Sequence, residues 1–205
     1  MPQWRKALFL AVLVCVVAAS TALAASITGT NGPDTLIGTT SNDTINALDG
    51  ADKVFGLAGN DLINAGSGDD VVYGDGQCPP GTRDASYCTT GETSKDGSDN
   101  IDGGTGNDTI YGGGGNDNID GGSVNGVSGD DTIDGGSGMD NIDGEAGNDV
   151  IDGGSGADNI SGNSGNDTIS AKDGTKDSIA CGAGFDRVTA DKSDVVSKDC
   201  ESVTR

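Results

Sequence analysis

The chain places a single aliphatic residue in a polar background at an almost constant interval. Sixteen Asp residues mark the pattern, and two positions after each of them stands Ile, Leu or Val. Eleven of the fifteen intervals between successive marker residues are nine residues long. One apolar side chain between polar neighbours, as in Thr109-Ile110-Tyr111, is typical of a three-residue strand whose middle side chain points inward. The markers are Asp34, Asp43, Asp52, Asp61, Asp70, Asp99, Asp108, Asp117, Asp131, Asp140, Asp149, Asp158, Asp167, Asp177, Asp186 and Asp194.

Six residues separate one predicted strand from the next, and they are rich in glycine. Gly stands two positions before the marker Asp in thirteen of the sixteen units. Glycine adopts backbone angles that other residues resist, so these segments predict tight reversals of the chain. Two nonapeptides would then form one coil, strand-turn-strand-turn, and successive coils would stack into two parallel sheets around a thin aliphatic core.

The most regular units identify a family. Gly103-Gly-Thr-Gly-Asn-Asp-Thr-Ile-Tyr111 and Gly153-Gly-Ser-Gly-Ala-Asp-Asn-Ile-Ser161 resemble the hemolysin-type calcium-binding repeats of the repeats-in-toxin (RTX) family, whose unit is G-G-x-G-x-D-x-U-x with U apolar. The resemblance covers about residues 29–197. It implies an all-β fold, a right-handed parallel β-roll (β-solenoid) of nonapeptide repeats with two short-stranded parallel sheets.

The resemblance also implies several calcium ions, each held between a turn and the equivalent turn one coil further on. The implied side-chain ligands are Asp61, Asp70, Asp99, Asp108, Asp117, Asp131, Asp140, Asp149, Asp158 and Asp167. The implied carbonyl ligands are Gly103, Gly104, Gly106, Gly112, Gly113, Gly115, Gly135, Gly136, Gly138, Gly144, Gly147, Gly153, Gly154, Gly156, Gly162 and Gly165. The stacked pairs are expected to be Asp108 with Asp131, Asp117 with Asp140, Asp131 with Asp149, Asp140 with Asp158, and Asp149 with Asp167. Ser41, Ala47 and Ala65 replace turn glycines in the N-terminal units, so sites at Asp43 and Asp52 are expected to be poorer.

The distribution of charged residues indicates a bound cation, and this argument does not depend on the resemblance to a family. The chain has a formal net charge of −22, and no Lys or Arg lies between Asp96 and Ala171. Acidity and 37 Gly would by themselves indicate disorder, but the repeat argues against it. Like charges stacked at the strand spacing repel by roughly 3 kcal/mol at an effective dielectric near 20. Oxygen donors and the absence of His favour calcium over zinc or copper. The alternative is a metal-free solenoid in which Asp only forms turns; Asn would serve equally well there, yet never replaces the marker.

The N-terminus predicts export. Arg5 and Lys6 precede an apolar run, and Ala22-Leu23-Ala24 offers a cleavage site, so residues 1–24 are expected to be a signal peptide cleaved near Ala24 and the protein secreted. The alternative is an uncleaved anchor, although the run is shorter than the about 20 residues that a membrane span needs. Removing two basic groups changes the charge from −22 to −24. We therefore expect no nucleic-acid partner, no membrane contact after cleavage, and a monomer.

Two interruptions and one ending divide the remaining chain. Residues 25–170 are expected to form the calcium-binding roll, with an insertion at 74–93 and a smaller one near 124–128 on the opposite edge. Residues 171–205 are degenerate repeats expected to cap the roll. Four mature cysteines allow three pairings, and proximity in sequence favours Cys78–Cys88 and Cys181–Cys200. The first pair would form a disulfide within the insertion. The insertion is either a loop that binds a partner or a surface loop without a function of its own.

The sequence argues against catalysis. Without His, neither a Ser-His-Asp triad nor an H-E-x-x-H zinc site can form. The competing hypothesis is an extracellular adhesion or recognition module in which calcium is only structural and the ligand is a glycan, a cell surface or ice. Thr precedes the marker Asp by three residues only at Thr40 and Thr105, which disfavours ice. No aromatic platform for a sugar is evident.

Overall fold

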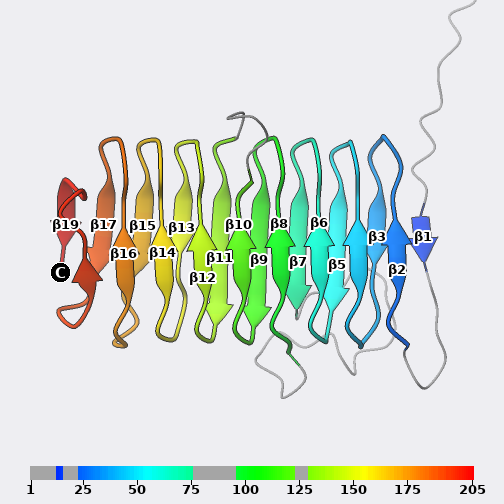
Figure 1. Cartoon of the computed structure of the whole chain (residues 1–205), viewed down its shortest axis with the longest axis horizontal. Helices are drawn as coiled ribbons and strands as arrows, with labels where there is room; N and C mark the ends of the chain where they lie inside the picture. The colour runs from blue at the N-terminus through cyan, green and yellow to red at the C-terminus, as the bar shows by residue number, and fades with distance from the viewer. Residues whose placement is uncertain (1–12, 16–22, 76–95, 123–128) are drawn as a thin grey trace, which may run out of the picture.

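The protein is a parallel β-solenoid. A computed structural model describes residues 13–15, 23–75, 96–122 and 129–205, and every regular element in these ranges is a strand. The strands alternate between a ten-stranded and a nine-stranded sheet, and every pairing is parallel. Figure 1 shows the coils stacked side by side along the long axis, from blue at the N-terminal end to red at the C-terminus. The predicted β-roll is confirmed.

Most strands are only three residues long. The ten-stranded sheet contains β1 (Leu13–Cys15), β3 (Thr35–Ile37), β5 (Lys53–Leu57), β7 (Val71–Asp75), β9 (Thr109–Gly114), β11 (Thr132–Ser137), β13 (Val150–Asp152), β15 (Thr168–Ala171), β17 (Arg187–Ala190) and β19 (Ser202–Thr204). The nine-stranded sheet contains β2 (Ser26–Thr28), β4 (Thr44–Asn46), β6 (Leu62–Asn64), β8 (Asn100–Asp102), β10 (Asn118–Asp120), β12 (Asn141–Asp143), β14 (Asn159–Ser161), β16 (Ser178–Ala180) and β18 (Val195–Val196).

Each coil consists of two nonapeptides, as the repeat predicts. Ile133 pairs with Ile151, eighteen residues later, and with Ile110 across the shorter interruption. Across the longer one Val72 pairs with Ile110 in the same register. The strand register therefore passes both interruptions unchanged. The described strands that precede the two interruptions, β7 and β10, belong to different sheets.

The interior is one aliphatic ladder. The middle residue of almost every strand is buried while its neighbours are largely exposed, which gives the alternation expected of a strand with one inward side chain. Fully buried members include Leu36, Ile45, Ile63, Ile101, Ile110, Ile119, Ile133, Ile142, Ile151, Ile160, Ile169 and Ile179. Each coil thus adds only two large side chains to the core.

Glycine is required where coils stack most closely. Gly138 has φ +141°, and a Cβ at this position would lie 1.4 Å from the carbonyl oxygen of Gly115 in the preceding coil. Any side chain there would separate the two turns. The second turn residue is less restricted, because Glu145 and Asn163 occupy it at φ 65° and 63°.

The two ends of the roll differ. At the N-terminal end β1, which lies inside the predicted signal peptide, pairs with β3. At the C-terminal end β19 and β18 complete the two sheets, and a disulfide joins Cys181 to Cys200 with Cα atoms 5.2 Å apart. This predicted pairing is confirmed. The predicted Cys78–Cys88 bridge lies outside the described residues.

Candidate metal site

The repeat turns align their marker Asp residues in two columns, one along each edge of the roll. Turns that lead from the ten-stranded to the nine-stranded sheet form the first column, and the returning turns form the second. The first column comprises Asp43, Asp61, Asp99, Asp117, Asp140, Asp158, Asp177 and Asp194. The second comprises Asp34, Asp52, Asp70, Asp108, Asp131, Asp149, Asp167 and Asp186. All sixteen side chains are buried.

After the first Asp of each column, one carboxylate oxygen accepts a hydrogen bond from the backbone N–H of the Asp one coil earlier. The backbone N–H of Asp108 donates to Oδ1 of Asp131 at 2.8 Å, and that of Asp149 donates to Oδ1 of Asp167 at 2.9 Å. The same bond repeats at 2.7 to 2.9 Å along both columns from Asp34 to Asp186. The five stacked pairs expected from the sequence are all brought together in this way.

The second carboxylate oxygen has no hydrogen-bond partner. It is buried and unpaired in nine of the ten predicted ligands, Asp158 being the exception, and also in Asp34, Asp52, Asp177 and Asp186. A buried carboxylate oxygen without a donor is costly unless a proton or a cation neutralises it. The turns therefore contain two rows of hard oxygen donors with unused binding capacity, which is the donor chemistry of calcium.

The first glycine of each turn makes room for a second oxygen. A Cβ at Gly135 would lie 2.8 Å from Asp140 Oδ2 and 2.6 Å from the carbonyl oxygen of Gly153, one coil further on. At Gly112 the same two kinds of oxygen would lie 2.6 and 2.5 Å away, from Asp117 and Gly135. A carboxylate oxygen and a carbonyl oxygen thus converge on the space that a side chain would fill. This arrangement fits calcium held by both groups.

Not every turn keeps this space open. Alanine or cysteine takes the first turn position at five places, and each of these side chains is buried in the apolar core. They are Ala47, Ala65, Ala171, Cys181 and Ala190. The predicted ligand Asp70 lies in one such turn, and so do Asp177, Asp186 and Asp194 of the predicted cap.

Burial shifts the titration of these carboxyl groups upward. Desolvation is the main cause, repulsion by the Asp of an adjacent coil adds to it, and the backbone N–H bond opposes it. The pKa rises to about 8 at Asp108 and to about 7 at Asp61, Asp99, Asp117, Asp140 and Asp149. It rises to about 6 at Asp70 and Asp131, and it is raised at Asp158 and Asp167. Without a cation, the fold thus favours proton uptake.

Comparison with protein families agrees with this geometry. The RTX calcium-binding nonapeptide repeat (4 copies) matches residues 28–63, 47–77, 93–127, 125–160, 134–169 and 152–188, which together make up more than half of the chain. The chain belongs to the RTX calcium-binding repeat family. A comparison with curated proteins found no match. Membership makes this a calcium-binding repeat protein, and the stacked Asp turns are the RTX turns.

The RTX geometry extends beyond the expected ligands. Asp43 and Asp52, expected to be poorer, belong to the same columns, and Asp177 and Asp186 continue both columns into residues 171–205. Both carboxylate oxygens of Asp43 accept hydrogen bonds, from Ala25 and Thr39, whereas Oδ2 of Asp52 is unpaired. Replacement of turn glycines thus leaves the Asp stacking intact and changes only the space beside it. Ligation by the individual Asp and Gly residues stays a prediction.

Sequence reasoning missed one buried acid and one aromatic stack. Asp75 is not a marker residue, yet it is buried with an unpaired Oδ1. Phe55, Tyr73 and Tyr111 stack along the outer face of the ten-stranded sheet, with ring centroids 5.1 and 5.0 Å apart. Their position directly after the inward strand residue could have revealed this row. Because the rings lie face to face, their faces pack on one another, which does not make the flat platform that a sugar would need.

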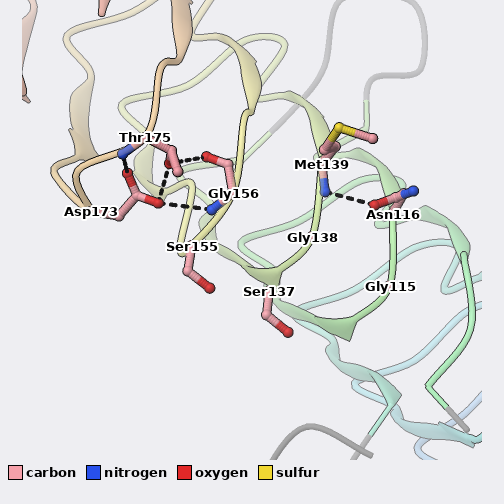
Figure 2. A pocket seen from close by; sticks show the side chains of 9 residues that line it. All are labelled: Gly115, Asn116, Ser137, Gly138, Met139, Ser155, Gly156, Asp173 and Thr175. Carbon is pink, nitrogen blue, oxygen red and sulfur yellow. Dashed lines mark hydrogen bonds between the residues drawn. The ribbon is translucent and has the colours of Figure 1, made fainter. Parts of the chain in front are cut away.

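The outer surface of the turns carries glycines and polar side chains, together with the exposed Met139. Figure 2 shows an open groove along one edge, where Asn116 accepts a hydrogen bond from the Met139 N–H at 2.8 Å and Asp173 accepts one from Gly156 N–H at 2.8 Å. Among the described residues no three Asp, Glu or Cys side chains form a side-chain metal cluster. An ion in an RTX turn therefore also needs backbone carbonyls.

Proposed function

We propose that this is a secreted protein whose RTX turns bind calcium outside the cell, and that this binding drives folding and makes the roll rigid. The rows of buried, unpaired carboxylate oxygens carry the proposal. Each coil buries few apolar side chains. Without a cation, this small hydrophobic gain has to offset the loss of conformational entropy on ordering about eighteen residues per coil. Calcium neutralises the carboxylates and links successive coils, which adds the missing stabilisation.

The proposal of export rests on the N-terminal sequence. Arg5, Lys6, the apolar run and Ala22-Leu23-Ala24 have the order of a signal peptide. No helix in the described ranges is long and apolar enough to cross a membrane. Recovery of the protein from the culture medium with Ala25 as its first residue would support export. Retention in the cell with an intact N-terminus would contradict it.

Calcium-dependent folding can be tested directly. We expect the protein to be largely unfolded in EDTA at low salt and neutral pH, and to gain β structure by circular dichroism as calcium rises through the micromolar to millimolar range. Magnesium is the matched control, because it prefers compact octahedral sites that retain water. An identical spectrum and melting temperature in EDTA and in calcium would overturn the proposal.

We further propose a structural rather than catalytic role. His, the most common general base, is absent from the sequence, and the described residues form a continuous roll. Adhesion through a glycan or cell surface remains the competing hypothesis. A pull-down from cell-surface extracts with and without calcium separates the two, since an adhesion module would capture a partner only when folded.

A further inference from the structure

Basic side chains gather at one edge of the roll near its C-terminal end. The turns after β15 and β17, which both lead from the ten-stranded to the nine-stranded sheet, carry Lys172, Lys176 and Lys192. Arg205 lies beside them, because its guanidinium donates hydrogen bonds of 3.4 Å to the carbonyl oxygens of Asp191 and Lys192. The four side chains are exposed. We call this group, Lys172, Lys176, Lys192 and Arg205, the basic edge.

The acidic residues of the same two turns are bound to the backbone. Asp173 accepts hydrogen bonds from the N–H groups of Gly156 at 2.8 Å and of Thr175 at 2.7 Å. Asp191 accepts one from the Gly174 N–H at 2.6 Å. With the described residues, the three lysines of the basic edge form no ion pair. Their ammonium groups are therefore available to a ligand of opposite charge.

Hydrogen bonds between successive turns hold the backbone of the basic edge in place. Thr175 Oγ1 donates to the carbonyl oxygen of Gly156 at 2.5 Å, and Ser193 Oγ donates to the carbonyl oxygen of Thr175 at 2.9 Å. These bonds join three successive turns on one edge of the roll. A binding surface whose backbone is already ordered loses less conformational entropy when a ligand binds.

The groove of Figure 2 lies on the same edge of the roll and reaches the basic edge. Hydroxyl groups of Ser137, Ser155 and Thr175 line it, together with the amide of Asn116 and the thioether of Met139. Thr175 belongs to the same turn as two of the lysines of the basic edge. Because hydroxyl and amide groups both donate and accept hydrogen bonds, a groove lined by them suits an extended polar chain.

We propose that this groove and the basic edge together bind a carboxylate-bearing polysaccharide. Sugar hydroxyls bond to the hydroxyl and amide groups of the groove, and sugar carboxylates pair with the lysines. A nucleic acid fits less well, because none of the residues that line the groove is aromatic and no base could stack there. Neutral sugars between the carboxylates also keep repulsion from the acidic roll low. This inference goes beyond calcium-dependent folding and gives the adhesion hypothesis a defined surface.

Fluorescence polarisation of a labelled hyaluronan oligosaccharide, with the full chain in saturating calcium, tests the basic edge. We expect Lys172→Gln combined with Lys176→Gln to weaken binding about tenfold, because two exposed ion pairs are lost. Lys53→Gln combined with Lys198→Gln is the matched control. It removes the same charge, but Lys53 lies in β5 and Lys198 lies in the turn between β18 and β19, on the opposite edge. This control should bind like wild type.

A second pair of variants tests the groove. Ser155→Glu places a negative charge inside it, and Ser164→Glu places the same charge at the third position of a turn on the opposite edge. Both serines are exposed. We expect only Ser155→Glu to weaken binding. Sodium chloride should weaken binding by wild type, because salt screens exposed charges. Circular dichroism in saturating calcium confirms that each variant is folded.

The outcomes decide the proposal without involving calcium-dependent folding, which is measured separately in EDTA and in calcium. Weaker binding by the Lys172/Lys176 variant and by Ser155→Glu, with both controls unchanged, supports the polysaccharide surface. If wild type does not bind the oligosaccharide, or if variants and controls bind equally, the proposal is overturned. Equal binding of a neutral chitin oligosaccharide would overturn it as well, and so would binding to phosphatidylglycerol vesicles in place of hyaluronan.

Discussion

The backbone N–H of Asp140 donates a 2.9 Å hydrogen bond to Oδ1 of Asp158, one coil further along the roll. Asp140 in turn accepts the same bond from Asp117, at 2.8 Å. Each central Asp thus links three successive coils: its N–H donates to the Asp one coil later, and its carboxylate accepts from the Asp one coil earlier. This double role distinguishes internal positions from those at the ends of the columns.

Replacing Asp140 with Ala should therefore be more damaging than the same change at Asp194. The first variant leaves the buried Asp117 N–H without its acceptor, a loss of about 1–3 kcal/mol, and removes a carboxylate from two stacked turns. Asp194 lies in a shortened turn and accepts a longer bond of 3.2 Å. Calcium titration and thermal unfolding should show fewer bound ions and a lower melting temperature for Asp140→Ala. Equal losses in both variants would contradict the repeat assignment.

Acid should partly replace calcium. The pKa values of Asp108 and Asp140 rise in the fold to about 8 and 7, whereas an unfolded Asp keeps its ordinary value near 3.8. Between about pH 4 and pH 7 the calcium-free fold holds protons that the unfolded chain has released, so its stability is greatest near pH 4 and falls as the pH rises. Circular dichroism in EDTA should show more β structure at pH 4.5 than at pH 8. Calcium affinity should fall over the same acidic range, because protons and calcium compete for the carboxylates.

A side chain in place of the first glycine of a turn should weaken calcium binding, because it fills the space between the Asp Oδ2 and the carbonyl oxygen of the next coil. Gly135→Ala would bring a Cβ to 2.8 Å from Asp140 Oδ2 and 2.6 Å from the Gly153 carbonyl oxygen. We expect a loss of about 1–3 kcal/mol in stability and at least one weakened ion. Gly32→Ala is the control, because its added Cβ would have no atom within 4 Å. If both variants titrate like wild type, this space has no part in binding.

The C-terminal segment should act as a stop for the roll. Residues 171–205 contain six of the eleven basic residues, and their turns begin with Ala171, Cys181 and Ala190 instead of Gly. Removing them should expose the edges of β14 and β15 and promote self-association in light scattering, with little loss of bound calcium. A truncated protein that stays monomeric, or that loses several ions, would show that the segment has another role.

The disulfide of this segment should add stability without affecting calcium. In the chain-entropy model a cross-link over 19 residues contributes about 3 kcal/mol. Replacing Cys181 and Cys200 together with Ser should lower the unfolding temperature in saturating calcium and leave the stoichiometry unchanged. Unchanged unfolding would mean that core packing alone holds the last coils.

The sequence by itself determined the coil. A nine-residue interval with one aliphatic and one Asp position predicts one short strand per unit, because alternation allows one inward side chain in a three-residue strand. The coil of two such units was predicted on this basis and is confirmed by the eighteen-residue pairing of Ile133 with Ile151. The pairing of Asp140 with Asp158 follows from counting eighteen residues. Proximity in the sequence favoured the pairing of Cys181 with Cys200, and the structure contains this bridge.

Only the tertiary structure decided which atoms are left without partners. Counting predicts that carboxylates stack, but it does not show that Oδ1 is used by a backbone N–H while Oδ2 remains unpaired beside a glycine. It also does not place Asp75, which lies outside the marker pattern, beside Gly113 of the next coil. Both relationships depend on contacts between coils, and a contact across the stack is set by three-dimensional packing rather than by the local pattern of any single turn.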